Sequence, residues 1–227
     1  MVEKPVISAD EAAAKIREGD TLMVGGFLGC GSPPDLIDAL ERSGAGSLTL
    51  VCNDTGVHNL KTGACYLVAK LVAGKRFKKI IVSHIGTNGE TQRQMNEGET
   101  EVVLVPQGTL AERIRSAGAG LGGILTPTGI GTEVQEGKQV LESGGRKFLL
   151  ETALPGDVAL IKARKADKAG NLVYDKCARN FNPLMAMACR TVIAEADEIV
   201  EIGQIDPETV VTPSVFVDYL VWSGKRG

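Results

Sequence analysis

Apolar and polar positions along this chain alternate in blocks rather than singly. Four short runs are almost entirely apolar, and polar or amphipathic stretches separate them. Such runs are typical of strands buried on both faces, because helices cover both sides of the parallel sheet that the strands form. The pattern predicts strands over residues 21–24, 47–52, 79–83 and 101–105.

Helix signals occupy the stretches between these runs. Ser8 and Glu11 form a capping-box pattern ahead of an Ala-rich stretch that reaches Arg17. Pro33 and Pro34 suit the first turn of a helix whose apolar side chains share one face. The predicted helices cover residues 8–17, 33–40, 59–73, 90–97, 109–116 and 183–189.

Glycines change this pattern between residues 118 and 145. The stretch is expected to be a long irregular section. Strand-like segments follow at 147–150, 158–163, 171–174 and 191–194, and an ordered strand or arm is expected over 210–222. No repeat or linker-like composition divides the chain, so residues 1–227 are expected to form a single domain. The predicted fold is α/β, with an open, mostly parallel sheet, helices on both faces and a Gly-rich irregular section.

Composition and charge narrow the class of protein. The hydrophobic fraction of 43% is ample for a packed core, and the net charge of −3 argues against a nucleic-acid-binding surface. No apolar run reaches the ~18 residues that span a bilayer, and the first residues contain no apolar leader. We therefore expect a cytoplasmic protein with no membrane or nucleic-acid partner.

Cysteine and histidine offer little support for disulfides or a metal site. The five cysteines contain no Cys-x-x-Cys pair, so a disulfide framework is not expected. His58 and His84 lie far apart in the sequence and have no ligand-like spacing, so no metal site is predicted.

A Gly-rich segment joins the first predicted strand to the next helix. Its residues Gly25, Gly26, Phe27, Gly29 and Gly31 allow backbone N–H groups to approach an anion or a carbonyl near a helix N-terminus. Tight turning is the alternative interpretation. Cys30 lies within the same segment, where a helix N-terminus could lower a thiol pKa. A small packing residue is the preferred interpretation of Cys30.

Polar side chains follow two other predicted strands. Parallel sheets bind ligands beyond the carboxyl ends of their strands, and Asn53 and Asp54 stand at such an end. The Asn53 amide can donate to a developing oxyanion, whereas helix capping is the alternative that suits Asp54 better. Gln107 and Gly108 follow another strand. Gln107 offers both a donor and an acceptor for a carboxylic acid or its thioester, and a capping turn is an equally good interpretation.

The acidic residues near the C-terminal end do not add a catalytic group. Glu195, Asp197, Glu198 and Glu201 lie on a segment that is expected to be solvated. The residues alone therefore predict an α/β ligand-binding protein without an evident nucleophile, base or metal.

The sequence resembles family I coenzyme A transferases. The resemblance starts at Gly25-Gly26-Phe27-x-x-x-Gly31-x-Pro33 and continues through residues 51–57, 106–113 and 128–132. It then covers residues 165–167, 170–171, 178–182 and 205–207, so it spans nearly the whole chain in order. The sequence is most similar to the α subunits of the acetate or butyrate–acetoacetate type and to the N-terminal half of the succinyl-CoA:3-oxoacid type.

This resemblance implies a ping-pong exchange with coenzyme A as co-substrate and no permanently bound cofactor. The covalent glutamate of the family lies in a Ser-Glu-Asn-Gly motif on the β subunit, and this sequence has no such motif. The resemblance therefore implies a β-subunit partner, with α₂β₂ as the expected assembly. It also implies that Asn53 is the oxyanion donor, and that the Gly-rich segment, Gln107 and Gly108 border the substrate pocket.

One alternative belongs to a different class of protein. A non-catalytic metabolite sensor could be built on the related sheet of the sugar-phosphate isomerases. That alternative predicts a fused DNA-binding segment or tight binding of a ligand by the chain alone.

Overall fold

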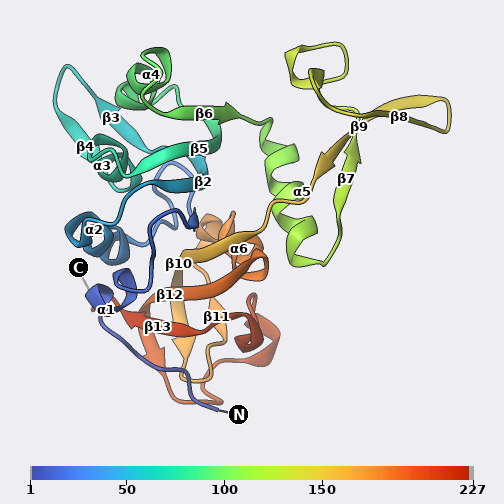
Figure 1. Ribbon diagram of the computed structural model, residues 1–227. Helices are drawn as coiled ribbons and strands as arrows, with labels where there is room; N and C mark the ends of the chain where they lie inside the picture. Colours follow the sequence, from blue (N-terminus) through green and yellow to red (C-terminus); the bar gives the residue numbers. More distant parts are fainter. Residues whose placement is uncertain (1, 225–227) are drawn as a thin grey trace.

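The computed structural model describes residues 2–224 and shows an open sheet of seven parallel strands (Figure 1). The strand order is β13-β12-β10-β1-β2-β5-β6, and the short β11 pairs antiparallel with β10. The strands have the following bounds: β1 Thr21–Val24, β2 Leu48–Asp54, β5 Phe77–His84, β6 Glu101–Leu104, β10 Gly156–Asp167, β11 Leu172–Val173, β12 Cys189–Val200 and β13 Tyr219–Trp222. This arrangement confirms the predicted parallel sheet.

The chain changes direction across the sheet at β1. From β1 it moves outward through β2, β5 and β6, and it later returns to the other side of β1 with β10, β12 and β13. Ligands of open parallel sheets bind where the strand order reverses, outside the carboxyl ends of the strands. The loop that follows β1 lies at this position.

Helices cover both faces of the sheet, as predicted. Leu22 and Val24 of β1 belong to one core cluster, and Met23 between them belongs to the other. The first cluster includes side chains of α1, α2 and α3, and the second includes side chains of α5 and α6. The helices have these bounds: α1 Ala9–Ala13, α2 Pro34–Ser43, α3 Val68–Ala73, α4 Gly89–Asn96, α5 Gln107–Gly118 and α6 Asn182–Ala188.

The predicted helix over residues 59–73 is wrong in its first half. Residues there form a hairpin of β3 (Val57–Asn59) and β4 (Ala64–Tyr66), and only α3 is helical. The side chain of Asn59 accepts hydrogen bonds from two N–H groups in the turn, and Gly63 closes the turn with φ of +73°. Asparagine and glycine favour this turn over a continued helix. The first helix is also shorter than predicted and ends at Ala13.

The Gly-rich section contains regular structure that was not predicted. Strands β7 (Gly123–Thr126), β9 (Arg146–Thr152) and β8 (Val140–Ser143) form a separate antiparallel sheet in that order. This small sheet projects from the main body beyond α5 (Figure 1). The predicted strand over 147–150 therefore exists but belongs to the projecting sheet. Most side chains of β7 and β8 are not buried, so these strands lack the apolar run that marks the strands of the main sheet.

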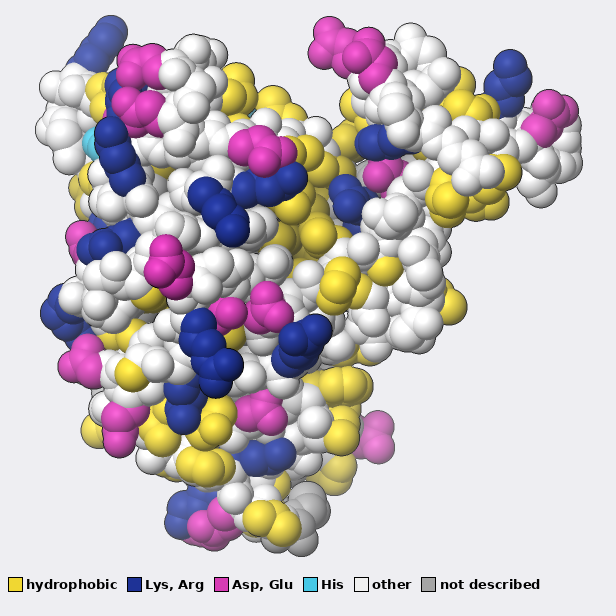
Figure 2. Space-filling view, viewed as in Figure 1, with side chains coloured by type: hydrophobic (Ala, Val, Ile, Leu, Met, Phe, Trp, Pro, Cys, Tyr) yellow, Lys and Arg dark blue, Asp and Glu magenta, His cyan; other side chains and the backbone are white. Residues whose placement is uncertain are grey.

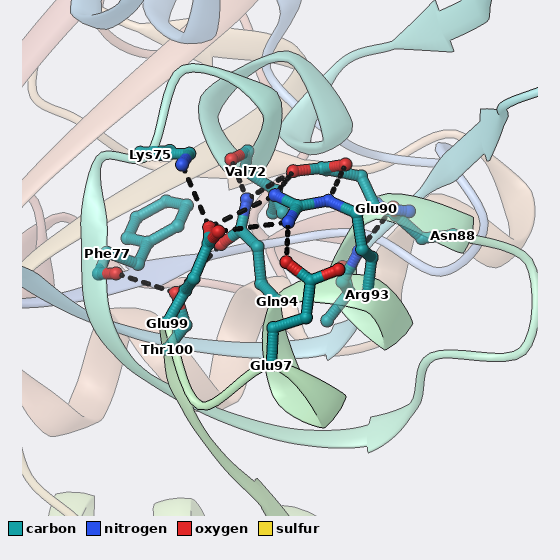
Figure 3. A network of polar contacts seen from close by, with 11 residues as sticks. Val72, Lys75, Phe77, Asn88, Glu90, Arg93, Gln94, Glu97, Glu99 and Thr100 are labelled. Carbon is teal, nitrogen blue, oxygen red and sulfur yellow. Dashed lines mark hydrogen bonds and ion pairs between the residues drawn. The ribbon is translucent and has the colours of Figure 1, made fainter.

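The helix α4 is fixed to the body by polar contacts. Arg93 bonds the carboxylates of Glu90, Glu97 and Glu99, and Gln94 donates to the carbonyl of Val72 at 2.8 Å (Figure 3). The bonds of Arg93 lie within α4 and the turn that follows it, and this network reaches the body through the ion pair of Glu99 with Lys75 at 2.9 Å. The predicted polar helix is thus attached by this ion pair and by the buried amide of Gln94.

The prediction of a solvated acidic segment is wrong for Glu195. This segment is the long strand β12, and Glu195 is fully buried there. Its carboxylate accepts hydrogen bonds from the first N–H groups of α2, at 2.9 Å from Asp35 and 3.0 Å from Leu36. Lys162 lies 3.2 Å from the same carboxylate. Glu195 is therefore the N-terminal anchor of α2.

The C-terminal segment is only partly a strand. Of residues 210–222, Tyr219–Trp222 forms β13, and Ser214–Phe216 forms a short 3-10 turn. Within the described residues, no helix is long and apolar enough to cross a membrane.

Candidate functional site

Three segments converge at the carboxyl end of the sheet. The loop after β1 carries the Gly-rich segment, β2 ends with Asn53 and Asp54, and α5 begins with Gln107. The structure joins these segments by hydrogen bonds between side chains and backbone, so residues far apart in the sequence form one cluster.

Asn53 lies at the centre of this cluster and is 2% exposed. Its Oδ1 accepts from Nε2 of Gln107 at 2.6 Å, and its Nδ2 donates to Asp54 at 2.7 Å. The hydroxyl of Ser83 donates to the backbone carbonyl of Asn53 at 2.7 Å. These partners fix the orientation of the amide. Among the described residues, Asp54 is the one acceptor for Nδ2, and the second N–H has no partner there.

Asp54 connects Asn53 to the Gly-rich loop. Its Oδ2 also accepts from the backbone N–H of Leu28 at 2.8 Å, and its Oδ1 accepts from the N–H of Gly56 at 2.9 Å. A hairpin strand follows Asp54, so the predicted helix-capping role for this residue is wrong. The carboxylate instead forms a tight Asx turn with Gly56.

The glycines of the loop are required by space and backbone conformation. A Cβ on Gly25 would lie 1.7 Å from Oδ1 of Asn182, and a Cβ on Gly31 would lie 2.7 Å from the carbonyl of Ala178. Gly26, Gly29 and Gly31 also have positive φ. Gly25, Gly26 and Gly29 line a small pocket together with Asp54. Phe27, by contrast, points outward and is 42% exposed.

Asn182, at the start of α6, holds the loop from the other side. Its Nδ2 donates to the carbonyls of Gly31 and Ala178, and its Oδ1 accepts from the N–H of Lys162 on β10. Sequence reasoning assigned no role to Asn182 or Ser83. Ser83 stands at a strand end as Asn53 does, which is the signal that could have identified it.

The predicted packing role for Cys30 is wrong. Cys30 is exposed, and its Sγ lies 3.2 Å from Sγ of Cys177 in the 3-10 turn Lys176–Arg179. The bond to Cys177 raises the pKa of the Cys30 thiol. This direction is opposite to the lowered pKa that a helix N-terminus could have produced. All five cysteines are free.

A groove adjoins Gln107 and Gly108 between α5 and the projecting sheet. Gly108, Thr109 and Glu112 line one side, and Ile124 and Leu125 line the other. Figure 2 shows hydrophobic side chains gathered in the hollow between the main body and this sheet. Leu104 and Leu125 are about half exposed, at 51% and 46%. Gln107, which bonds Asn53, is thus exposed beside a groove whose far wall carries the apolar side chains of Ile124 and Leu125.

The structure brings the predicted site residues to one end of the sheet. Asn53 and Gln107 are in direct contact, and Asp54 and Leu28 link them to the Gly-rich loop. The arrangement offers the oriented amide of Asn53 as a donor, and the exposed Gln107 stands beside it. The described residues contain no group of three or more His, Cys, Asp or Glu side chains that could hold a metal ion.

Comparison with known proteins places this arrangement in a family. The coenzyme A transferase family matches residues 6–223. The α subunit of acetate CoA-transferase from Escherichia coli K12 is 50% identical over 218 residues, which are 96% of this chain and 96% of that protein. The corresponding subunit of succinyl-CoA:3-ketoacid coenzyme A transferase from Helicobacter pylori J99 is 44% identical over 99% of this chain and 94% of its own length.

A solved structure agrees with the fold. An acyl-CoA transferase from Escherichia coli O157:H7, solved as a thioester complex with CoA, superposes with a TM-score of 0.85 at 23% identity. The match covers 97% of this chain but 47% of that protein, so the chain spans about half of its length. The fold, the near-complete family match and these identities lead to one assignment: the chain belongs to the coenzyme A transferase family, as an α-type subunit.

Proposed function

We propose that this chain is the α half of an enzyme that moves coenzyme A between an acyl-CoA and a short-chain carboxylic or 3-oxo acid. Acetate, acetoacetate and butyrate are the class of acid that we propose. Coenzyme A is then a co-substrate, and no permanently bound cofactor is required. Support comes from relatives named for acetate and for succinyl-CoA:3-ketoacid transfer.

The oriented amide of Asn53 carries the proposal. In the exchange, a carboxylate attacks the thioester carbonyl, and negative charge develops on the carbonyl oxygen. An amide N–H stabilises that oxyanion without changing its own charge, and a pre-oriented donor is worth about 2.7–4 kcal/mol. Asn53 has one N–H bonded to Asp54, and its second N–H is free for this purpose.

The covalent nucleophile is proposed to lie on a partner chain. Asp54 is the carboxylate within the cluster, but it is 6% exposed and already accepts three hydrogen bonds. Glu112 lines the adjoining groove and is paired with Arg115 at 2.8 Å. The family's Ser-Glu-Asn-Gly motif is missing from this sequence. The relatives that match nearly the whole chain are each named as one subunit of a transferase, which implies a second, β-type partner. We propose an α₂β₂ assembly.

The proposed reaction has two symmetric halves. The partner's glutamate attacks the acyl-CoA, and the CoA thiolate leaves and then attacks the glutamyl carbonyl of the mixed anhydride. The first carboxylic acid departs, and a glutamyl-CoA thioester remains. A second acid reverses the sequence. Because carboxylate and thioester exchange is nearly balanced in energy, the protein chiefly positions the reactants and stabilises oxyanions.

The remaining pocket assignments are part of the same proposal. Gly25, Gly26, Phe27, Gly29 and Gly31 would border the substrate together with Gln107 and Gly108. We propose a single-domain chain that acts in the cytoplasm, without a nucleic-acid or membrane partner. The sensor alternative loses its support because the compared relatives are named as transferase subunits.

The test removes the amide of Asn53. In the complex with its β subunit, Asn53→Ala is expected to lose on the order of 10²-fold in kcat while the complex stays assembled. Asn96→Ala is the matched control, because Asn96 is exposed at the end of α4. Turnover by Asn53→Ala equal to that of the control would contradict the assignment.

A further inference from the structure

We propose that Asp54 is a positioning residue that joins the Gly-rich loop to Asn53 and fixes the orientation of the Asn53 amide. The inference rests on the oxyanion role proposed for Asn53. It concerns a residue that does not touch the reacting atoms and acts through its neighbour.

The three hydrogen bonds of Asp54 require a carboxylate. Oδ2 accepts from Nδ2 of Asn53 and from the N–H of Leu28, and Oδ1 accepts from the N–H of Gly56. All three partners are donors, and an asparagine side chain has only one acceptor oxygen. With an asparagine at position 54, at least one of these donors would face an NH₂ group in a buried site.

Asp54 selects one of the two orientations of the Asn53 amide, because a carboxylate can only accept hydrogen bonds. Gln107 donates to Oδ1 from one side, and Asp54 accepts from Nδ2 on the other. A flipped amide would set its oxygen against the Asp54 carboxylate, and this contact is repulsive in a buried site. Gln107 has both a donor and an acceptor, so it can match either orientation of Asn53. The orientation with Nδ2 on the Asp54 side is therefore the stable one.

The same carboxylate holds the loop in an unusual conformation. Leu28 has φ of +47°, which non-glycine residues seldom adopt, and its N–H points to Asp54 in this state. Phe27 and Cys30 exchange two backbone hydrogen bonds around it. A non-glycine residue persists in this region when its surroundings hold it there. Asp54 is a buried part of those surroundings and ties the loop to Asn53.

This arrangement predicts an effect on turnover more than on binding. Loss of the Asp54 carboxylate leaves the Asn53 amide in place but free to rotate. Outer-shell groups that orient the ligands of a metal typically contribute about 10- to 100-fold to activity, and we take the lower end of this range for an amide oriented by a carboxylate. We therefore expect Asp54→Asn to lower kcat by about tenfold and to change KM for acyl-CoA by less than about threefold.

A double-mutant cycle in the α–β complex separates this role from a general structural one. Asp54→Asn, Asn53→Ala and the double variant are compared in acyl-CoA and acetoacetate exchange. If Asp54 acts through Asn53, Asp54→Asn lowers kcat in the wild-type background and adds nothing to Asn53→Ala. Equal effects in both backgrounds, or no effect in either, would overturn the inference. Wild-type turnover by Asn53→Ala would instead remove the oxyanion role itself.

A second measurement needs no variant and stands even if Asp54→Asn does not fold. Hydrogen exchange by NMR reports the backbone amide of Leu28, whose side chain is 50% exposed. The bond to Asp54 predicts that this amide is protected although it lies on an exposed loop. Exchange at the rate of a free loop amide would show that Asp54 does not hold the loop.

Discussion

At position 25 the chain has no room for a side chain. A Cβ there would overlap Oδ1 of Asn182, the residue whose amide bonds both Gly31 and Ala178. Gly108, which begins the other border of the proposed pocket, has open space around its Cβ position in this chain. Steric overlap therefore excludes a side chain at position 25, whereas position 108 has room for one.

The contrast predicts opposite results for two alanine variants. Gly25→Ala is expected to lower the free energy of unfolding by about 1–3 kcal/mol, because the overlap displaces Asn182. Gly108→Ala, in the first turn of α5, is expected to be neutral or to stabilise by up to about 1 kcal/mol. Denaturant unfolding of the two variants measures both effects. Equal stability of the two variants would contradict the packing described at Gly25.

Gly108→Ala also tests whether Gly108 borders the substrate pocket. If substrate occupies the space beside Gly108, Gly108→Ala loses exchange activity in the α–β complex while its stability is retained. Full activity would remove Gly108 from the proposed pocket.

Glu195 provides a prediction for the dependence of stability on pH. Burial raises the pKa of its carboxyl above the ordinary 4.5, although Lys162 and the N–H groups of α2 oppose the shift. The folded chain therefore binds this proton more readily than the unfolded chain. The contribution of Glu195 to stability falls as pH rises from about 4.5 through the raised pKa, and it levels off above.

Unfolding free energies of wild type and Glu195→Gln, measured across this range, isolate the effect. Their difference, wild type minus variant, is expected to decrease with rising pH. Glu198→Gln, exposed on the same strand, controls for the introduction of an amide. A difference that grows with pH would contradict a pKa raised by burial at Glu195.

At the scale of elements, the stability of helix α4 depends on the ion pairs that Arg93 and Lys75 form with glutamates. Hydrogen bonds from Arg93, and then Lys75, lower the pKa of the Glu99 carboxyl to about 2. A lowered pKa means that this contribution to stability is present above about pH 4.5 and is lost as the pH falls towards 2. Salt also weakens the ion pairs of Glu99 with Arg93 and Lys75, because these side chains are near the surface.

Arg93→Met is therefore expected to lower the melting temperature, with a larger loss at low than at high ionic strength. The loss should shrink as the pH falls below about 4.5. Arg115→Met, which removes a single exposed pair with Glu112, serves as the control and should show a smaller loss. A salt-independent loss for Arg93→Met would point to packing by its aliphatic stem instead.

The elements that sequence reasoning located well are those buried on both faces. Leu22 to Val24 and the apolar part of β2 face two cores at once, so their hydrophobic runs reveal them. The hairpin around Asn59 was missed because its strands have only three residues each and none of their side chains is buried. The projecting sheet was missed for the same reason, since burial on both faces is lacking in β7 and β8.

Some residues of the site could be located from the sequence, whereas the contacts that depend on loop conformation could not. Asn53 and Gln107 could be located because each follows a predicted strand of one sheet. The contact of Asp54 with Leu28 could not, because it depends on a positive φ at a leucine and on a loop 26 residues away. Likewise, Asn182 meets the loop at Gly31 across 151 residues of sequence.

At the scale of the whole molecule, the reversal of strand order at β1 determines where chemistry can occur. It places the Gly-rich loop, Asn53 and Gln107 at the carboxyl end of the sheet. The groove between α5 and the projecting sheet lies beside them (Figure 2). This end of the sheet supplies an oriented donor. Its two carboxylates are engaged, Asp54 by three hydrogen bonds and Glu112 by Arg115 at 2.8 Å. In the proposed exchange the nucleophile therefore comes from a partner that covers this end of the sheet.

Intact mass measurement of the two chains tests this requirement most directly. The chain is assembled with its β subunit, mixed with acetoacetyl-CoA, and quenched before the second acid is added. We predict a mass increase equal to coenzyme A less one water, as expected for a thioester, only on the β subunit. The same increase on this chain, or exchange activity of this chain without its partner, would contradict the proposed division of the enzyme into two chains.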